Sequence, residues 1–219
     1  MVKSRPELKG IYALTDPALT PGEALYQAVE QALRGGVALV QYRDKSASGA
    51  ERHERARKLL EICRDYAKPL IINDDVEVAR ASGAAGVHLG AADTSLAQAR
   101  RVLGPRAIIG ISCYNRLESG VAMAGAGADY VAFGSAYPSP TKPEAVHAPL
   151  SLYRRAKSAL AAPVCAIGGI DADNAAALLA CGVDMLAVIS GIFAQKDIES
   201  AARRLVACVQ AAQPHSSID

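Results

Sequence analysis

The segment QYRDK, residues 41–45, places polar side chains at alternate positions at the end of an apolar run. Because side chains alternate along an extended chain, Gln41, Arg43 and Lys45 are predicted to project from one face. Tyr42 and Asp44 are predicted to project from the other. Two cations and an amide on one face would bind an anion. A solvated charge cluster opening a surface turn would give the same pattern, so this segment alone leaves both interpretations open.

Acidic side chains follow the next two apolar runs, where Asp74 and Asp93 would be neighbours if those runs are adjacent strands. Mg²⁺ prefers oxygen ligands and often takes one or two carboxylates, with water and substrate phosphates completing its shell. The pair therefore predicts a Mg²⁺ site. Helix capping is the alternative. It is weaker for Asp93, because Ser95 and Gln98 already match a capping pattern, and it stays open for Asp74, since Asp74 or Asp75 could cap the next helix.

Small residues follow the last two apolar runs, as Gly168-Gly169 and Ser190-Gly191. Glycine lets the backbone approach a ligand closely, and phosphate is commonly bound by backbone N–H groups at such positions in barrel enzymes. A double glycine alone also fits a tight turn. Taken at both strand ends, the pattern favours a phosphate site.

These groups together offer more anion-binding capacity than one monophosphate needs. Cations and a metal pair suit a diphosphate, and the glycines suit a second, separate phosphate. The residues thus predict an enzyme that joins a diphosphate ester to a phosphorylated partner and releases Mg²⁺-pyrophosphate. Metal and cations would stabilise the charge on the departing oxygen.

Apolar runs alternate with longer amphipathic stretches such as 21–36 and 48–68, which is typical of parallel α/β folds. Eight such units in 219 residues predict a single-domain (β/α)₈ TIM barrel over 1–219, with a doubly wound open sheet as the alternative. The predicted strands are residues 10–15, 37–42, 69–73, 86–90, 107–112, 129–134, 163–168 and 184–190.

The segment 135–150, SAYPSPTKPEAVHAPL, is longer than most strand-to-helix connections. Long ordered loops in barrels often close over the active site, so it is predicted to be a lid that carries Lys142. A tolerated surface insertion is the alternative. His88 lies within an apolar run and is predicted to be a core histidine with its hydrogen bonds satisfied.

Composition excludes several classes of protein. The 24 basic and 22 acidic residues nearly balance, giving a net charge of +2 and no reason to expect nucleic acid or a membrane surface as partner. Five cysteines without C-x-x-C spacing argue against a disulfide framework and a zinc site. The charged start of the chain lacks a signal-peptide core, so a cytoplasmic protein is expected. The polar tail from about 213 to 219 is expected to be flexible.

The motifs, in their order and spacing, resemble the thiamine-phosphate synthase family over nearly the whole chain. They are YALTDP (12–17), QYRDK (41–45), LIINDD (70–75), GVHLG (86–90) with Asp93, GISCYN (110–115), DYVAFGSAYPSPTK (129–142), AIGGID (166–171) and AVISGIF (187–193).

The resemblance implies a (β/α)₈ barrel that couples 4-amino-2-methyl-5-hydroxymethylpyrimidine diphosphate to thiazole phosphate, in a Mg²⁺-dependent, dissociative reaction. It implies that Asp74 and Asp93 hold Mg²⁺ and that Lys142, Ser112 and Arg43 are catalytic. The pyrimidine diphosphate would be bound by Gln41, Tyr42, Arg43, Asp44, Lys45, Asn73, Ser112 and Lys142. The thiazole phosphate would be bound by Ser139, Pro140, Thr141, Gly169, Ile189 and Ser190.

The chain departs from the family pattern at two positions, Ala91 where glutamine is common and Ser139 where threonine is common. The segment SGIF also looks like the related thiazole tautomerases. A tautomerase-like or regulatory thiazole-phosphate-binding paralogue is therefore the alternative function. The expected partners are the two small-molecule substrates, and a homo-oligomer is compatible with the sequence.

Overall fold

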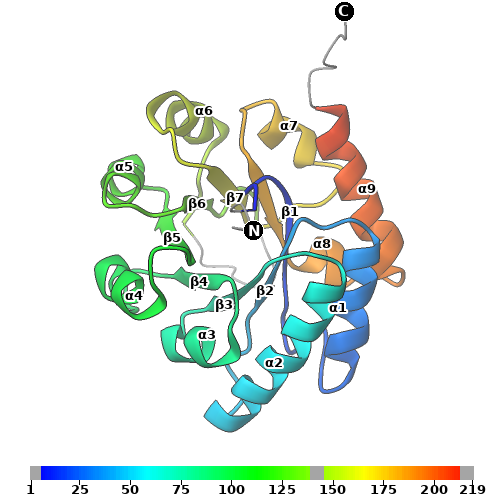
Figure 1. Ribbon diagram of the computed structural model, residues 1–219. Coiled ribbons are helices and arrows are strands. Elements are labelled where there is room, and N and C mark those ends of the chain that lie inside the picture. The colour runs from blue at the N-terminus through cyan, green and yellow to red at the C-terminus, as the bar shows by residue number, and fades with distance from the viewer. Residues whose placement is uncertain (1–5, 139–145, 213–219) are drawn as a thin grey trace, which may run out of the picture.

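The computed structural model describes residues 6–138 and 146–212, and within them eight parallel strands close into a barrel surrounded by helices (Figure 1). The strands are β1 (Gly10–Leu14), β2 (Leu39–Tyr42), β3 (Leu70–Asn73), β4 (Gly86–Leu89), β5 (Ile108–Tyr114), β6 (Tyr130–Gly134), β7 (Val164–Ile167) and β8 (Met185–Val188). The helices are α1 (Ala24–Arg34), α2 (Gly49–Asp65), α3 (Val76–Ser82), α4 (Leu96–Leu103), α5 (Leu117–Gly125), α6 (Leu150–Ala159), α7 (Ala175–Leu179), α8 (Ser190–Phe193) and α9 (Ile198–Ala211).

The predicted (β/α)₈ barrel is confirmed, and the open sheet is wrong because β1 pairs with β8 as well as with β2. Each predicted strand is present with ends shifted by one or two residues. β5 runs on to Tyr114, where its register with β6 shifts after Ser112. The predicted flexible tail and the centre of the predicted lid, residues 139–145, lie outside the described residues.

Local chemistry sets where the helices begin. Ser48 and Glu51 form a capping box at α2, in which the Ser48 N–H donates to Glu51 Oε2 at 2.9 Å and the Glu51 N–H donates back to Ser48 Oγ.

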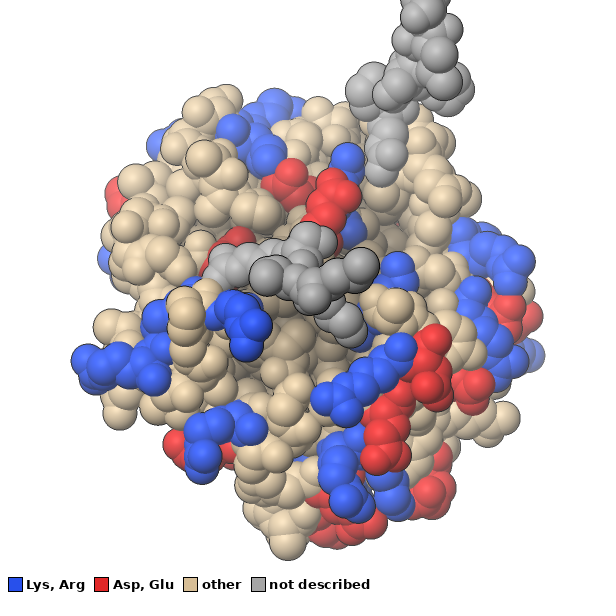
Figure 2. Space-filling view, viewed as in Figure 1, with Lys and Arg blue, Asp and Glu red and all other residues tan. Residues whose placement is uncertain are grey.

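Helix surfaces carry both signs of charge. In Figure 2 basic and acidic side chains lie close together over α1 and α2, where Lys58 and Glu54 are one of the pairs. None of the described helices is long and apolar enough to cross a membrane.

The core has two layers, because successive strand residues face opposite sides of the sheet. The outer layer lies between sheet and helices and includes Val40, Tyr42 and Ile72. The inner layer fills the barrel and includes Leu39, Ile71 and Tyr130. All five cysteines are free thiols, in agreement with the predicted absence of a disulfide framework, and four are buried.

Gly110 of β5 makes room for Tyr130, one of the tyrosine side chains inside the barrel. A Cβ atom built on Gly110 would lie 1.9 Å from Cζ of Tyr130, which is fully buried. No side chain fits at that distance, so the Tyr130 ring occupies the space that any other residue at position 110 would need.

We expect Gly110→Ala to destabilise the fold by about 3 kcal/mol, because the added methyl group overpacks the barrel interior. Gly125→Ala is the matched control: its Cβ would meet nothing within 4 Å, and alanine at a helical position stabilises by about 0.5 kcal/mol. Urea unfolding followed by circular dichroism measures both. Equal stability of the two variants would contradict this account of the interior.

Candidate active site

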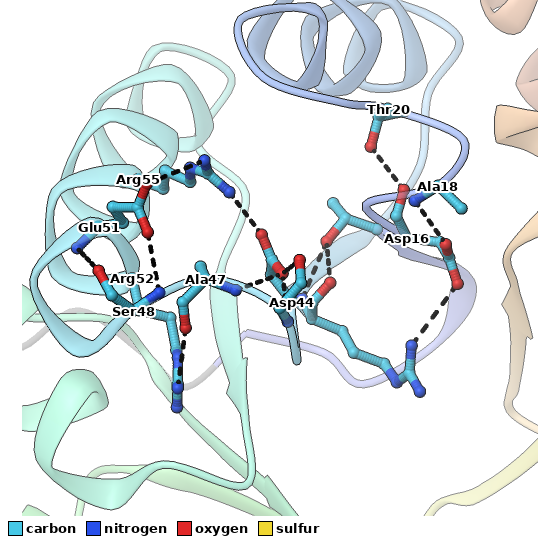
Figure 3. A network of polar contacts seen from close by, with 12 residues as sticks. Asp16, Ala18, Thr20, Asp44, Ala47, Ser48, Glu51, Arg52 and Arg55 are labelled. Atoms are coloured by element: carbon cyan, nitrogen blue, oxygen red, sulfur yellow. Dashed lines mark hydrogen bonds and ion pairs between the residues drawn. The ribbon is translucent and has the colours of Figure 1, made fainter.

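Gln41 lies near the end of β2 and Arg43 just beyond it, both on the side that faces into the barrel, as the alternation predicted. Gln41 is only 1% exposed and its Nε2 donates to the Tyr12 hydroxyl at 2.8 Å. Arg43 is half-buried, and its Nη1 lies 3.6 Å from Oδ2 of Asp16. Thr15 holds the Arg43 backbone, since its Oγ1 accepts from the Arg43 N–H at 2.9 Å and donates to the Arg43 carbonyl oxygen at 3.1 Å. The segment after β1, which includes Asp16 (Figure 3), therefore positions Arg43.

Tyr42 and Asp44 face the other way. Tyr42 packs in the outer core, and Oδ1 of Asp44 accepts from the backbone of Ser46 and Ala47 while Oδ2 contacts Arg55 at 2.6 Å (Figure 3). Burial opposes the ionisation of Asp44, but these hydrogen bonds outweigh it and lower its pKa. The structure does not bring the Tyr42 and Asp44 side chains to the group formed by Gln41 and Arg43. Asp44 fixes the loop that follows β2.

Asp74 and Asp75 differ in whether they cap α3. Asp75 caps α3, with its Oδ1 accepting from the Val78 N–H at 2.9 Å. Asp74 is not used as the cap and has a left-handed backbone with φ 64°, which is uncommon for a residue with a side chain. This removes capping as the explanation of Asp74.

Asp74 and Asp93 are brought together at the ends of β3 and β4. Burial raises the pKa of Asp74, and the neighbouring Asp93 carboxyl raises it further, while Lys45 opposes both with its Nζ 3.3 Å from Asp74 Oδ2. Asp93 is held in place by the Gly90 N–H, which donates to its Oδ2 at 2.7 Å. Two neighbouring carboxylates with one lysine beside them leave negative charge that the lysine does not fully offset. Such a site suits a hard divalent cation.

Within residues 6–138 and 146–212, no group of three or more acidic, histidine or cysteine side chains gathers to hold a metal. A cation held by Asp74 and Asp93 would have coordination positions left for water or for a bound substrate. This is the coordination that magnesium commonly adopts with phosphate compounds.

The inner face of the barrel beside these carboxylates is polar. Asn73 and Ser112 are half-buried at inward positions of β3 and β5. His88 is 9% exposed, with Nδ1 2.9 Å from the Tyr130 hydroxyl and Nε2 2.9 Å from Ser112 Oγ. The prediction of a satisfied core histidine is confirmed. Its position next to Ser112 had no counterpart in the sequence prediction.

Gly168 and Gly169 after β7 and Ser190 after β8 line one pocket, and the phosphate site expected there stays a prediction. The pocket lining is Ile167, Gly168, Gly169, Ile170, Ala187, Ile189 and Ser190. The backbone of Gly169 has φ 61°, and a Cβ there would lie 2.4 Å from the Pro138 carbonyl oxygen. Glycine is therefore required where the loop after β6 crosses the end of β7.

The two described ends of the predicted lid are joined beside this pocket. The Ser135 N–H donates to the Val146 carbonyl oxygen at 2.7 Å, and the Ala148 N–H donates back to Ser135 at 2.8 Å. The Tyr137 N–H donates to the Gly168 carbonyl oxygen at 3.1 Å. The predicted site residues Ser139, Pro140, Thr141 and Lys142 lie outside the described residues, and their roles stay predictions.

The fold and the polar residues at its strand ends define a barrel enzyme of the (β/α)₈ class, which carries its chemistry at the carboxyl ends of the strands. A family model described as thiamine monophosphate synthase matches residues 11–192. The chain belongs to this family.

Individual relatives agree with the family match. A thiamine-phosphate synthase of Thioalkalivibrio sulfidiphilus is 53% identical over 207 residues, covering 94% of this chain and 98% of that protein. One of Thiobacillus denitrificans is 53% identical, covering 90% and 92%. A solved thiamine phosphate pyrophosphorylase from Pyrococcus furiosus is 35% identical with a TM-score of 0.86, covering 96% and 99%. The predicted family, and with it a transferase of thiamine biosynthesis, is confirmed.

We expect Asp75→Ala to lower the free energy of unfolding by about 1 kcal/mol, because it removes the cap of α3. Asp74→Asn should leave stability equal or higher, since asparagine tolerates a left-handed backbone and carries no charge to repel Asp93. Urea unfolding of both variants without metal makes the comparison. A loss in Asp74→Asn as large as that in Asp75→Ala would show that Asp74 serves the fold.

Proposed function

We propose that the chain transfers the 4-amino-2-methylpyrimidin-5-ylmethyl group from its diphosphate to thiazole phosphate, giving thiamine phosphate and pyrophosphate. The observation that carries this proposal is the pairing of Asp74 with Asp93 beside Lys45, at the strand ends of a barrel whose relatives are thiamine-phosphate synthases. A site for a diphosphate with its metal ion is what the reaction requires.

Asp74 and Asp93 would hold Mg²⁺, and the crowding of their charges supports this assignment. When bound, Mg²⁺ acts as a Lewis acid that stabilises negative charge on diphosphate oxygens. Lys45 and Arg43 add positive charge on the same side, with Asp16 holding the Arg43 guanidinium. Ser112 donates a hydrogen bond to the diphosphate.

The proposed reaction is dissociative. The C–O bond to the diphosphate breaks first and its electron pair leaves with pyrophosphate, after which the thiazole nitrogen donates its lone pair to the carbon. No side-chain nucleophile is needed. The thiols of Cys113 and Cys165 are poor nucleophiles, because burial raises the pKa of Cys113 to about 11 and that of Cys165 further. Both therefore stay protonated at neutral pH.

The second substrate is assigned to the pocket at β7 and β8. Gly169, Ile189 and Ser190 line it, and the backbone approaches there without side chains in the way. Ser139, Pro140 and Thr141 would complete the thiazole-phosphate site, and Lys142 would bring a further cation to the departing pyrophosphate. These four assignments rest on the family resemblance alone.

The test is to mix the protein with both substrates and follow thiamine phosphate by fluorescence after oxidation. We expect product with Mg²⁺, none with excess chelator, and recovery when Mg²⁺ is restored. Ligand binding without turnover would favour a regulatory thiazole-phosphate-binding protein. Undiminished turnover without any divalent ion would remove the metal from the proposal.

We expect Asp93→Ala and Lys142→Ala each to lower kcat at least about 100-fold, because Asp93 would hold the metal ion, and Lys142 would supply the cation, that stabilise charge on the leaving pyrophosphate. Asp65→Ala is the control, since Asp65 is exposed at the end of α2, away from the strand ends. Circular dichroism confirms that each variant is folded. Near-wild-type turnover in Asp93→Ala or Lys142→Ala would remove that residue from the site.

A further inference from the structure

A chain of hydrogen bonds crosses the barrel interior and joins two of the predicted ligand-binding residues. It runs from Gln41 Nε2 to the Tyr12 hydroxyl (2.8 Å), to the Tyr130 hydroxyl (3.0 Å), to His88 Nδ1 (2.9 Å), and from His88 Nε2 to Ser112 Oγ (2.9 Å). Its members come from five strands. The three central residues are at most 9% exposed, so bulk water does not compete for their hydrogen bonds.

The Gln41 end gives this chain a direction. The amide Nε2 can only donate, so the Tyr12 oxygen accepts, and the Tyr12 proton is used within the chain only if Tyr12 donates to Tyr130. The Tyr130 oxygen is then an acceptor as well, and its own proton goes to His88 Nδ1. In the reverse direction, Tyr12 would accept from both Gln41 and Tyr130, and its own proton would have no place in the chain.

The same logic continues through the histidine. A neutral imidazole has one donor and one acceptor nitrogen, so an accepting Nδ1 requires the proton on Nε2. His88 Nε2–H then donates to Ser112 Oγ, and the Ser112 proton is left to point away from the chain. Burial raises the pKa of both Tyr12 and Tyr130, which keeps both hydroxyl protons in place.

Packing holds these groups in position. The His88 and Tyr130 rings are stacked with centroids 5.5 Å apart, and the Tyr12 ring meets Tyr130 edge-on at 5.9 Å. The Tyr130 ring fills the space that the absent side chain of Gly110 leaves. The chain is therefore a fixed part of the barrel core and does not depend on a ligand for its order.

We propose that Tyr12, Tyr130 and His88 are positioning residues that keep His88 as its Nε2–H tautomer and so present the Ser112 hydroxyl to the substrate as a hydrogen-bond donor. A diphosphate oxygen only accepts hydrogen bonds, so the opposite direction would aim a lone pair of Ser112 at an anion. The identity of this acceptor rests on the proposed function, whereas the direction of the chain is inferred from the contacts and from the use of every hydroxyl proton within it.

The direct test is the tautomer of His88 in the wild-type protein without ligands. Long-range ¹H–¹⁵N spectra of the imidazole distinguish the protonated ring nitrogen, and contacts with the stacked Tyr130 ring assign the signal to His88. We expect a neutral ring with the proton on Nε2 at neutral pH. A proton on Nδ1, or a doubly protonated ring, overturns the proposal.

Two variants test whether the chain acts on the ligand. Tyr130→Phe removes the hydroxyl that sets the His88 tautomer. Tyr153→Phe is the matched control: Tyr153 is also fully buried and its hydroxyl donates to the Phe133 carbonyl oxygen at 3.0 Å, outside the chain. With Mg²⁺ present, we expect Tyr130→Phe to give mixed tautomers and to weaken inorganic pyrophosphate binding about fivefold. Tyr153→Phe should leave the tautomer unchanged and the affinity within about twofold of wild type.

The outcomes separate this proposal from the proposed function. An unchanged tautomer and unchanged pyrophosphate affinity in Tyr130→Phe overturn the positioning role; if that variant does not fold, Tyr12→Phe, which cuts the chain next to Gln41, gives the same comparison. An Nε2–H His88 in a protein without coupling activity supports the direction of the chain and counts against the function. Coupling activity in a protein whose His88 carries its proton on Nδ1 supports the function and counts against the direction of the chain.

Discussion

Closure of eight parallel strands into a barrel is the constraint on which every other feature depends. Closure forces alternate residues of each strand into one enclosed volume, where each apolar group must pack and each polar group must find a partner. The last inward positions of the strands then meet at the carboxyl-end face. Gln41, Asn73 and Ser112 are such positions, Asp74 follows directly after β3, and Asp93 lies in the loop after β4.

Much of this arrangement could be predicted from the sequence, because it follows from periodicity. The two-residue repeat of QYRDK placed Gln41 and Arg43 on one face, and the apolar runs located all eight strands. The order and spacing of the sequence motifs also identified the family. The choice between Asp74 and Asp75 as the cap of α3 could not be made, since both stand where a capping residue can stand and only backbone geometry separates them.

Contacts between strands far apart in the chain were beyond sequence reasoning. Tyr12 and Tyr130 are separated by 118 positions, and each stands alone among apolar neighbours, which suggests only a core aromatic. Their meeting with His88 depends on the register of strands that are not adjacent and on the space left at Gly110. The clue was the presence of hydroxyl-bearing rings within strands, because a buried tyrosine usually finds a hydrogen-bond partner.

The site combines an ordered, hydrogen-bonded barrel interior with two acidic side chains at the strand ends that repel one another. The hydrogen-bonded interior is complete without ligand, whereas burial and the neighbouring Asp93 carboxyl oppose the ionisation of Asp74 and Lys45 offsets this only in part. A cation relieves that repulsion but finds few ligands in the described protein. A diphosphate supplies oxygens to the cation and meets Arg43 and Lys45. Metal and diphosphate should therefore bind as a unit.

The measurement that tests this claim most directly is calorimetric titration of inorganic pyrophosphate into the protein, with Mg²⁺ and with excess chelator. Because coupling between two ligands is reciprocal, each should strengthen the binding of the other. We predict that Mg²⁺ tightens pyrophosphate binding at least about tenfold, equivalent to about 1.4 kcal/mol. Equal affinity with and without the metal would contradict a shared metal-diphosphate site at Asp74 and Asp93.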